Sequence, residues 1–413
     1  MHIGQKSKVL MSMALAVTVG LLLNVQAANA AGKIYITNRG SATGDATVSV
    51  ANLDGTGGEI LGDGDFNDSL YSGPRSIALN TATGKMYVTT DGATMTVAFL
   101  DGTGAVSLNY PGPRLSFDTG DIALDTVAGK MYITDFWGTI LAANLDGTGL
   151  NGLGNLAGTL NNGGLPSTYG VALDTIQEKM YVTNSSSNTV CVANLDGTGG
   201  ISLGNLNGTL SSPFGIVLDA IHGKIYVANA GNNTVSVANL DGTGGMSLGN
   251  FNDTLNGPKG IALDMVAGRI YVVNSGNNTV SVANLDGTGG ESLGDLNGTL
   301  NNPYGIAVDI YYNLNWLSPR SGATFQTGST VPVRFQLTDE NGKNVTTANA
   351  TLMLVSPSGA LVKPTTGNVF RYNNTIHLYV YSLNTKKLAS GTWQLQVTLD
   401  DGSPVKTTSI TLR

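Results

Sequence analysis

Histidine and cysteine, the side chains most often used in general-base and metal chemistry, are scarce in this chain. The 413 residues include three histidines and one cysteine. His2 lies in an apolar N-terminal segment, His222 in a turn, and His377 in a strand of a different region, so no two are expected to converge. No H-E-x-x-H or C-x-x-C pattern occurs. The sequence therefore argues against a histidine-based catalytic or metal centre.

Carboxylates could also form a metal or acid–base site, and here they follow a repeating pattern. Five aspartates end a recurring apolar phrase such as GIALD, and six stand in Asp-Gly pairs: Asp125, Asp174, Asp219, Asp264 and Asp309, then Asp54, Asp101, Asp146, Asp196, Asp241 and Asp286. They could form an acidic, metal-binding rim, or each could cap the backbone of its own turn. Because the same positions recur along the chain, we favour capping.

One stretch has the ligand spacing of a calcium loop. In GDGDFND, the side chains of Asp63, Asp65 and Asn67 follow the D-x-D-x-N pattern, but Pro74 stands where a calcium loop has its bidentate glutamate. Related stretches, GNFNDTL and GDLNGTL, occur elsewhere in the chain. We interpret the stretch as a longer copy of an ordinary connection and keep a calcium site as the weaker alternative, so no cofactor is expected.

Aromatic and basic residues form a third group of candidates, because they differ between the repeats. They stand just before the GIALD-like phrase or in one loop that contains a Phe-Trp pair: Arg75, Arg114, Tyr169, Phe214, Lys259, Tyr304, Phe136 and Trp137. Such side chains are common contact anchors, and loops on rigid scaffolds often carry function. The phenyl and phenol rings could instead pack beneath an adjacent repeat, whereas no sister repeat has an equivalent of Trp137.

The elements that position these residues follow from an internal repeat. AGNNTVSVANLDGTGG at 230–245 returns at 275–290 with one change, and a tyrosine recurs at Tyr35, Tyr87, Tyr132, Tyr181, Tyr226 and Tyr271. A period near 45 residues with short alternating strands is typical of a propeller blade. We expect four strands a blade: GIALD-like, IYVVN-like, TVSVAN-like and a short fourth after LDGTGG, with tight turns at the Asp-Gly pairs.

The ends of the repeat region predict how the ring closes. The region opens on the second strand, KIYITN, and ends on a first strand, GIAVD, and each phrase occurs six times. We therefore predict an all-β, six-bladed propeller over 31–310, in which the last first-type strand completes the first blade. Such closure removes exposed sheet edges.

These phrases resemble a known repeat class. GKMYITDFWGTILAANLDGTG at 129–149, preceded by DIALD, is similar to the YWTD repeat, and the YVTN-like strands of the other blades resemble bacterial YVTN and NHL repeats. The resemblance implies a six-bladed propeller of the TolB-like class. The Trp of the YWTD pattern is absent from every second strand.

The 45-residue period stops after 310. We expect a linker at 311–316 and an immunoglobulin-like β-sandwich at 317–413, because alternating runs such as TVPVRFQL and TWQLQVTL are separated by turn signals. Pro332, Val333, Arg334 and Phe335 are similar to the bacterial PxKF-type module, with Arg in place of Lys. The resemblance implies an accessory module without chemistry of its own.

The first residues have the pattern of an export signal. Lys6 and Lys8 precede an apolar run, and Ala28 and Ala30 stand at the positions of an A-x-A cleavage site, so 1–30 is predicted to be a signal peptide. No other long apolar run occurs, so we expect no transmembrane segment in a mature chain that begins near Ala31. We expect a periplasmic, extracellular or cell-surface location, in a bacterium. Residues 31–315 hold 10 basic and 24 acidic residues, which argues against nucleic acid as a partner.

These observations favour a non-enzymatic binding protein whose loop face recognises a protein or a polysaccharide. The resemblance also admits a metal-dependent, gluconolactonase-like hydrolase, in which Asn184, Asn229 and Asn274 could line the central channel, or a lyase. A structural matrix or adhesion component is a further alternative.

Overall fold

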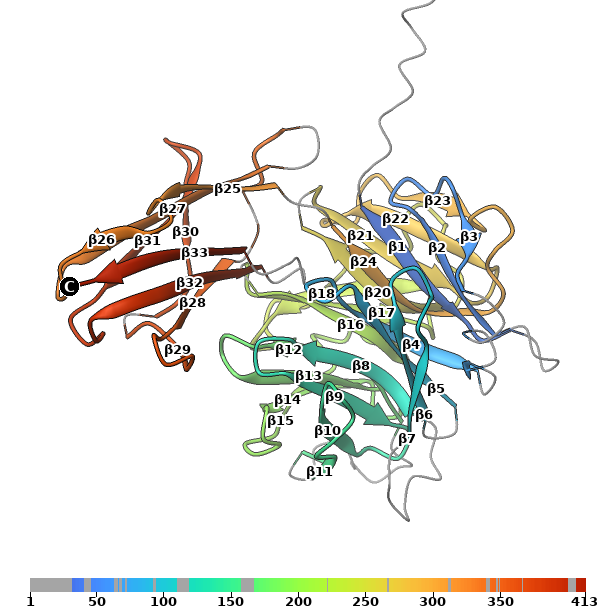
Figure 1. Cartoon of the computed structure of the whole chain (residues 1–413). Helices are drawn as coiled ribbons and strands as arrows, with labels where there is room; N and C mark the ends of the chain where they lie inside the picture. Colours follow the sequence, from blue (N-terminus) through green and yellow to red (C-terminus); the bar gives the residue numbers. More distant parts are fainter. Residues whose placement is uncertain are drawn as a thin grey trace, which may run out of the picture.

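The computed structural model describes residues 32–40, 46–62, 66, 69–70, 73–91, 94–109, 119–156, 167–220, 222–265, 267–310, 313–338, 342–346, 348, 350–365, 367–399 and 406–413. The predicted signal peptide, Arg114 and the calcium-loop candidates Asp63, Asp65 and Asn67 lie outside these ranges. In the part that is described, the fold is all-β, as predicted (Figure 1).

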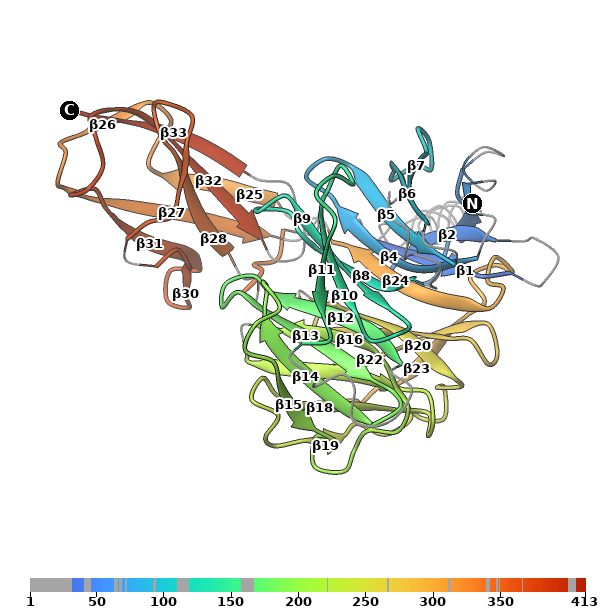
Figure 2. The ribbon, with the colours of Figure 1, turned by 90° about the horizontal axis from the view of Figure 1, so that it is seen from below.

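Six four-stranded antiparallel sheets form the blades of a propeller, seen in two views in Figures 1 and 2. The second blade contains β4 (Pro74–Asn80), β5 (Lys85–Thr90), β6 (Thr94–Phe99) and β7 (Val106–Asn109), and the third contains β8 (Thr119–Asp125), β9 (Lys130–Asp135), β10 (Ile140–Asn144) and β11 (Asn151–Gly154). The fourth blade contains β12 (Thr168–Asp174), β13 (Lys179–Asn184), β14 (Thr189–Asn194) and β15 (Ile201–Gly204), and the fifth contains β16 (Pro213–Asp219), β17 (Lys224–Asn229), β18 (Thr234–Asn239) and β19 (Met246–Ser247). The sixth blade contains β20 (Pro258–Asp264), β21 (Arg269–Asn274), β22 (Thr279–Asn284) and β23 (Glu291–Gly294).

The first sheet joins the two ends of the repeat region. It contains β24 (Pro303–Asp309), β1 (Lys33–Asn38), β2 (Thr47–Asn52) and β3 (Glu59–Ile60), in that order. β24 pairs antiparallel with β1, with Lys33 opposite Asp309. The innermost strand of each sheet contacts the innermost strands of both neighbours around the whole ring. The blades are therefore arranged in a closed circle.

Both faces of each blade are buried because neighbouring blades stack on them. On β18, Val235 and Val237 belong to a cluster that includes Ile261 of the next blade, whereas Ala238 belongs to a cluster with Leu206 from the connection before the blade. Because side chains alternate along TVSVAN, one face of this strand packs in each of the two interfaces that the blade makes with its neighbours. Burial of these side chains is the main source of stability for the ring.

The repeated aspartates other than Asp309 cap their own turns. Asp241 Oδ1 accepts hydrogen bonds from the backbone N and the Oγ1 of Thr243, at 2.9 and 2.6 Å. At the end of the first strand, Asp264 Oδ1 accepts one from the backbone N of Ala267 at 2.8 Å. The lysine that opens the second strand of this blade contacts an asparagine, since Lys224 Nζ donates a hydrogen bond to Asn239 Oδ1 at 2.8 Å.

The asparagines of the repeated NNT phrase connect the blades. Asn233 has φ of 57°, a left-handed conformation that asparagine tolerates better than most residues, and its Oδ1 accepts a hydrogen bond from the backbone N of Gly257 at 2.8 Å. Asn278 does the same for the backbone N of Asn302. The sixteen repeated residues therefore provide one blade's third strand, its turn and a bond to the next blade.

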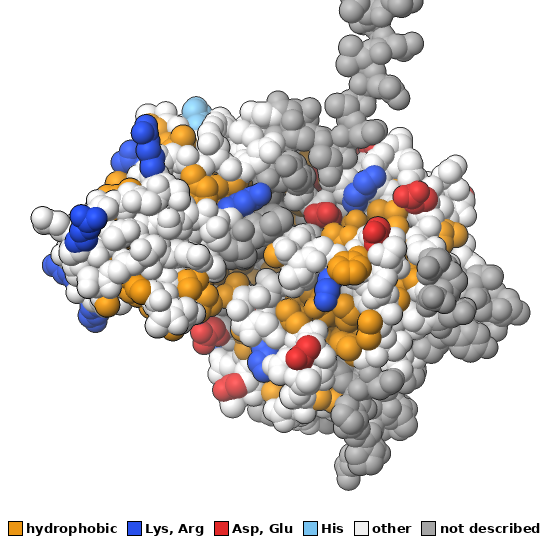
Figure 3. All heavy atoms as spheres, viewed as in Figure 1, with side chains coloured by type: hydrophobic (Ala, Val, Ile, Leu, Met, Phe, Trp, Pro, Cys, Tyr) orange, Lys and Arg blue, Asp and Glu red, His pale blue; other side chains and the backbone are white. Residues whose placement is uncertain are grey.

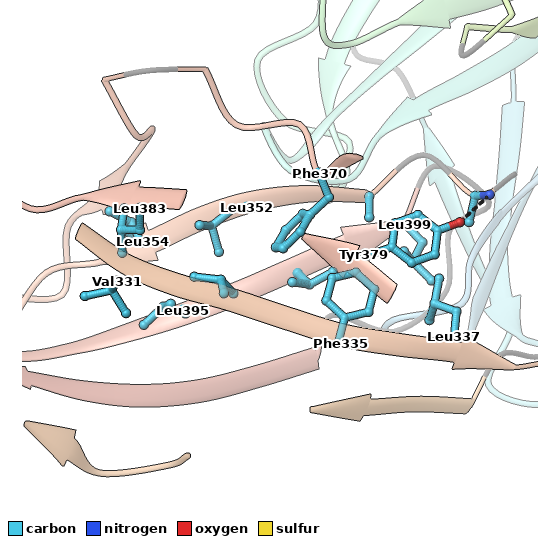
Figure 4. Packing of buried hydrophobic residues seen from close by; sticks show 14 of the residues in the cluster. Val331, Phe335, Leu337, Leu352, Leu354, Phe370, Tyr379, Leu383, Leu395 and Leu399 are labelled. Atoms are coloured by element: carbon cyan, nitrogen blue, oxygen red, sulfur yellow. Dashed lines mark hydrogen bonds between the residues drawn. The ribbon is translucent and has the colours of Figure 1, made fainter. Parts of the chain in front are cut away.

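The C-terminal region is a two-sheet sandwich with its own core. One sheet has the order β25 (Asn313–Ser318), β27 (Thr330–Thr338), β31 (Leu378–Asn384) and β30 (Arg371–Asn373). The other has β26 (Ala323–Phe325), β33 (Lys406–Leu412), β32 (Gly391–Leu399), β28 (Ala350–Val355) and β29 (Leu361–Val362). Figure 4 shows side chains from both sheets meeting in the core, where the Tyr379 hydroxyl accepts a hydrogen bond from the backbone N of Ala348.

The predicted linker at 311–316 is wrong in part, because β25 begins at Asn313. Leu314 and Trp316 alternate with more exposed residues, and both pack against the sandwich core. β25 also pairs along β27, with Trp316 opposite Phe335. The sandwich therefore begins before the predicted boundary at 317.

Candidate binding face at the mouth of the propeller channel

The innermost strands present their second residues at one end of the central channel. Aligned by their pairing with the second strands, these positions hold Tyr304, Arg75, Gly120, Tyr169, Phe214 and Lys259. The residue of the third blade that is equivalent to Arg75 is therefore Gly120 and not Arg114, as the sequence had suggested. Pro113 stands directly before Arg114, like the proline that precedes this position in four other blades, whereas Gly120 follows Thr119.

Phe136 occupies the place that Gly120 leaves open. Its ring meets Tyr169 edge-on, with centroids 5.2 Å apart, and Tyr169 stacks on Phe214 at 4.0 Å. Phe214 meets Tyr304 edge-on at 4.9 Å, and the Arg75 guanidinium lies 5.7 Å from the Tyr304 ring and 5.6 Å from the Phe136 ring. One side chain from each blade thus contributes to a closed circle. We call Arg75, Phe136, Tyr169, Phe214, Lys259 and Tyr304 the belt.

Lys259 completes the belt above two of its rings. The Lys259 ammonium lies 4.1 Å from the Phe214 centroid and 5.4 Å from that of Tyr304. Burial lowers the pKa of Lys259 to about 8, and the nearby guanidinium groups of Arg39 and Arg75 add to the effect. Burial also raises the pKa of Tyr304 to about 12. At neutral pH the belt therefore carries a mostly protonated amine beside neutral phenols.

Arg39 and Asp91, which the sequence analysis did not identify, hold the belt in place. Asp91 forms ion pairs with both Arg39 and Arg75, and the Arg39 guanidinium lies 5.0 Å from the Tyr304 ring. Arg75 is 5% exposed, so its pairing with Asp91 is largely shielded from water. Arg39, Asp91 and Phe136 each follow directly on a second strand, where the last three blades have Ser185, Ala230 and Ser275.

Trp137 lies outside the belt and faces solvent. Its backbone N and that of Thr139 donate to Asp135 Oδ1, at 2.9 and 2.7 Å, which fixes the turn that carries Phe136 and Trp137. Trp137 is 52% exposed, whereas the adjacent Phe136 is half-buried. Of these two neighbours, Phe136 is therefore part of the belt and Trp137 is exposed beside it.

Beneath the belt the channel is narrow. A cavity of about 40 Å³ is lined by Ser76, Asp121, Gly170, Gly215 and Gly260, with belt side chains at its mouth. Small-molecule sites usually have volumes of several hundred Å³. The space suits a few water molecules or one small polar group, so an extended ligand has to lie across the belt.

Asp121 is the carboxylate of this channel lining and connects three blades. Its Oδ2 accepts a hydrogen bond from the backbone N of Val171 at 3.0 Å, and its Oδ1 accepts one from the Ser76 hydroxyl and one from the backbone N of Ile122. Burial raises its pKa to about 6, although these hydrogen bonds favour the ionised form. The channel wall keeps part of this side chain in contact with the cavity.

The raised pKa predicts a pH dependence of stability. Because folded Asp121 binds its proton more tightly than the unfolded chain does, its contribution is fully present below about pH 4 and is lost as pH rises through about 6. We expect the unfolding free energy, relative to Asp121→Asn, to fall by about 2 kcal/mol between pH 4 and pH 7. Denaturant titrations of both proteins across this range test the effect, and parallel pH profiles would contradict it.

The asparagines considered as channel ligands are used within the blades. Asn229 Nδ2 donates to Ser236 Oγ at 2.8 Å, and its Oδ1 accepts from the backbone N of Ser211 at 3.1 Å. Asn274 makes the equivalent bonds to Ser281 and Asn256, and Asn184 is also buried. Within the described ranges, no cluster of three or more His, Cys, Asp or Glu has a metal-binding arrangement. Phe66, from the calcium-like stretch, is buried in a blade core with Leu70.

The surface differs in charge between the two regions. On the face shown in Figure 3, Lys and Arg side chains gather on the sandwich, and most of the visible Asp and Glu side chains lie on the propeller. The belt cations therefore lie on a propeller that is otherwise acidic.

The described part of the chain contains no helix with the length and apolar character needed to cross a bilayer.

Comparison with known proteins supports the propeller fold. Residues 255–283 match the NHL repeat model. A chain in the crystal structure of the nidogen/laminin complex is similar over 67% of this chain and 98% of its own length, with a TM-score of 0.54 and 16% identity. A functionally unknown protein from Desulfotomaculum acetoxidans DSM 771 matches over 66% of this chain and 88% of its own, with a TM-score of 0.44 and 16% identity. The search of curated proteins found no match.

Proposed function

We propose that the protein is a non-enzymatic binding protein and that the belt, with Trp137 beside it, is the face that holds a protein partner. The observation that carries this proposal is the closed circle of stacked rings and cations, to which every blade contributes. Aromatic and arginine side chains dominate the energetics of protein interfaces. The similar chain comes from a nidogen/laminin complex, which agrees with a protein-binding use of this fold.

The belt is suited to binding rather than to turnover. The cavity of about 40 Å³ beneath it leaves little room for a substrate. The belt is also rigid before binding, because its rings stack on one another and Asp91 holds Arg75 of the belt and the adjacent Arg39. A preformed site of this kind loses little side-chain entropy when a partner docks. The export signal expected at 1–30 places such binding outside the cytoplasm.

A polysaccharide is the second candidate partner, and the exposure of Trp137 favours it. An indole that is 52% exposed on a loop can stack on a sugar ring as well as on a peptide. Tyr169 is also half-exposed beside it. In this case too the belt and Trp137 would form the contact surface.

Selection from a random peptide library tests the proposed function. We expect peptides selected on the full-length protein to bind at least about tenfold more weakly to Trp137→Ala, because an interface tryptophan typically contributes 2 kcal/mol or more. Trp316→Ala is not a suitable control, since that ring packs on the sandwich core; Ile376→Ala, at an exposed apolar site of the sandwich, is the matched control. Peptides that bind Trp137→Ala, Tyr169→Ala and the control equally would show that the face is not the site.

A further inference from the structure

Three cationic side chains, two of them from the belt and one beside it, gather around one aromatic ring. Arg39, Arg75 and Lys259 all lie near the Tyr304 ring, at 5.0, 5.7 and 5.4 Å from its centroid. Among the described residues, Asp91 is the carboxylate that pairs with them, and it contacts both arginines. These cations contrast with the propeller as a whole, which is acidic. Because Asp91 contacts the two arginines, Lys259 is the cation of this group that has no described carboxylate beside it.

Two donors in this group have unmet bonding capacity. Lys259 forms no ion pair and no hydrogen bond with a described residue, and its ammonium lies against the faces of two aromatic rings. Arg39 Nε is buried and has no acceptor among the described residues, although the terminal guanidinium nitrogen of the same side chain reaches Asp91. An unpaired buried donor is costly, and an ammonium on aromatic faces still lacks a hydrogen-bond acceptor.

The neighbourhood also shows what kind of anion fits. The depressed pKa of Lys259 has burial as its first cause and the two guanidinium groups as its second, so a carboxylate placed beside it would be stabilised by three cations. The rings of Phe214 and Tyr304 exclude water from one side of the ammonium. The cavity beneath the belt, with a volume of about 40 Å³ and Asp121 in its wall, is too small for a sugar ring, so the anion has to lie above it, against Lys259.

We propose that the belt recognises an acidic segment of a partner protein, with one Asp or Glu carboxylate seated against Lys259 and Arg39 at the mouth of the channel. This inference rests on the proposed function and specifies the chemistry of the partner. The aromatic side chains Tyr169 and Trp137 contact other residues of the same segment. Charge complementarity of this kind sets specificity and the rate of association more than it sets total affinity.

The test uses the full-length protein and a fluorescent glutamate-rich peptide, with the glutamine version of the same peptide as the ligand control. We expect the glutamate peptide to bind at least about tenfold more tightly than the glutamine peptide, and its affinity to fall steeply with added salt. Lys259→Met is expected to abolish that preference, and Lys259→Arg to restore most of it. Lys387→Met removes an exposed lysine of the sandwich and should have no effect. A thermal melt checks that each variant is folded.

Titration with pH supplies an independent readout. Binding should weaken between about pH 7 and about pH 9.5, because Lys259 loses its proton near pH 8. The other groups that face it keep their charge state in this range: burial raises the pKa of Tyr304 to about 12 and also raises that of Tyr169, and both arginines stay protonated. In Lys259→Arg this pH dependence should disappear.

The outcomes separate this inference from the proposed function. If library peptides need Trp137 and Tyr169 but contain no acidic residue and bind Lys259→Met normally, the binding face stands and the acidic-segment inference is wrong. If glutamate and glutamine peptides bind equally, the inference is also overturned. Tighter, Lys259-dependent binding of polygalacturonate than of the glutamate peptide would assign the carboxylate to a polysaccharide and would overturn the choice of a protein segment.

Discussion

Gly215→Ala is expected to lower the unfolding free energy of the propeller by about 3 kcal/mol or more. A Cβ at this position would lie 2.5 Å from the Lys259 carbonyl oxygen and 3.2 Å from the Gly260 Cα of the next blade. Both are backbone atoms of an inner strand, so relief of the clash requires two blades to separate at the channel. Because Lys259 is part of the belt, the same substitution should also weaken partner binding.

Gly152→Ala is the matched control for this prediction. Gly152 lies on the exposed strand β11, and a Cβ there would meet no atom within 4 Å. We expect its unfolding free energy to stay within about 0.5 kcal/mol of the parent value. Urea denaturation followed by circular dichroism compares the two, and equal stabilities would show that the inner strands are less closely packed than the structure indicates.

Phe251→Ala should be destabilising by about 3–5 kcal/mol. Phe251 lies in the connection from β19 to β20, is 1% exposed, and packs in one cluster with Val235 and Ile261, which belong to different blades. Loss of the ring leaves a cavity between these blades. Phe251→Leu should cost less than about 1.5 kcal/mol, because Leu206 and Leu296 occupy the equivalent positions of sister repeats. A leucine variant as unstable as the alanine variant would contradict this account.

The sequence predicted the propeller because its local and long-range signals agree. Alternation in TVSVAN, the Asp-Gly turns and the tyrosine period of about 45 residues all indicate the same blade, and the structure has the expected all-β fold. The start of the sandwich was harder to predict. In NLNWLS, Leu314 and Trp316 form too short an alternating run to be separated from a linker without their contacts in the core.

The belt could be predicted in part. Tyr169, Phe214, Lys259 and Tyr304 were identified because each stands directly before a glycine of the first strand. Gly120 was not predicted at the belt position of the third blade, although it lies two residues before Ile122 in the register of the other first strands. Arg39 and Asp91 share a repeat position with Phe136, but their charged side chains do not resemble its ring, so the sequence alone did not identify them. How these positions meet across the channel depends on ring closure, which no single repeat encodes.

The sheet shared by β24 and β1 also has a kinetic consequence. β1 is made first and its partner β24 last, so the first blade cannot be completed until almost the whole repeat region has been synthesised. Contacts between residues so distant in the sequence slow folding, because loop closure precedes any gain from the contact. A chain of this design stays incompletely folded while it is being made. That delay suits a polypeptide expected to cross a membrane in extended form before its ring closes.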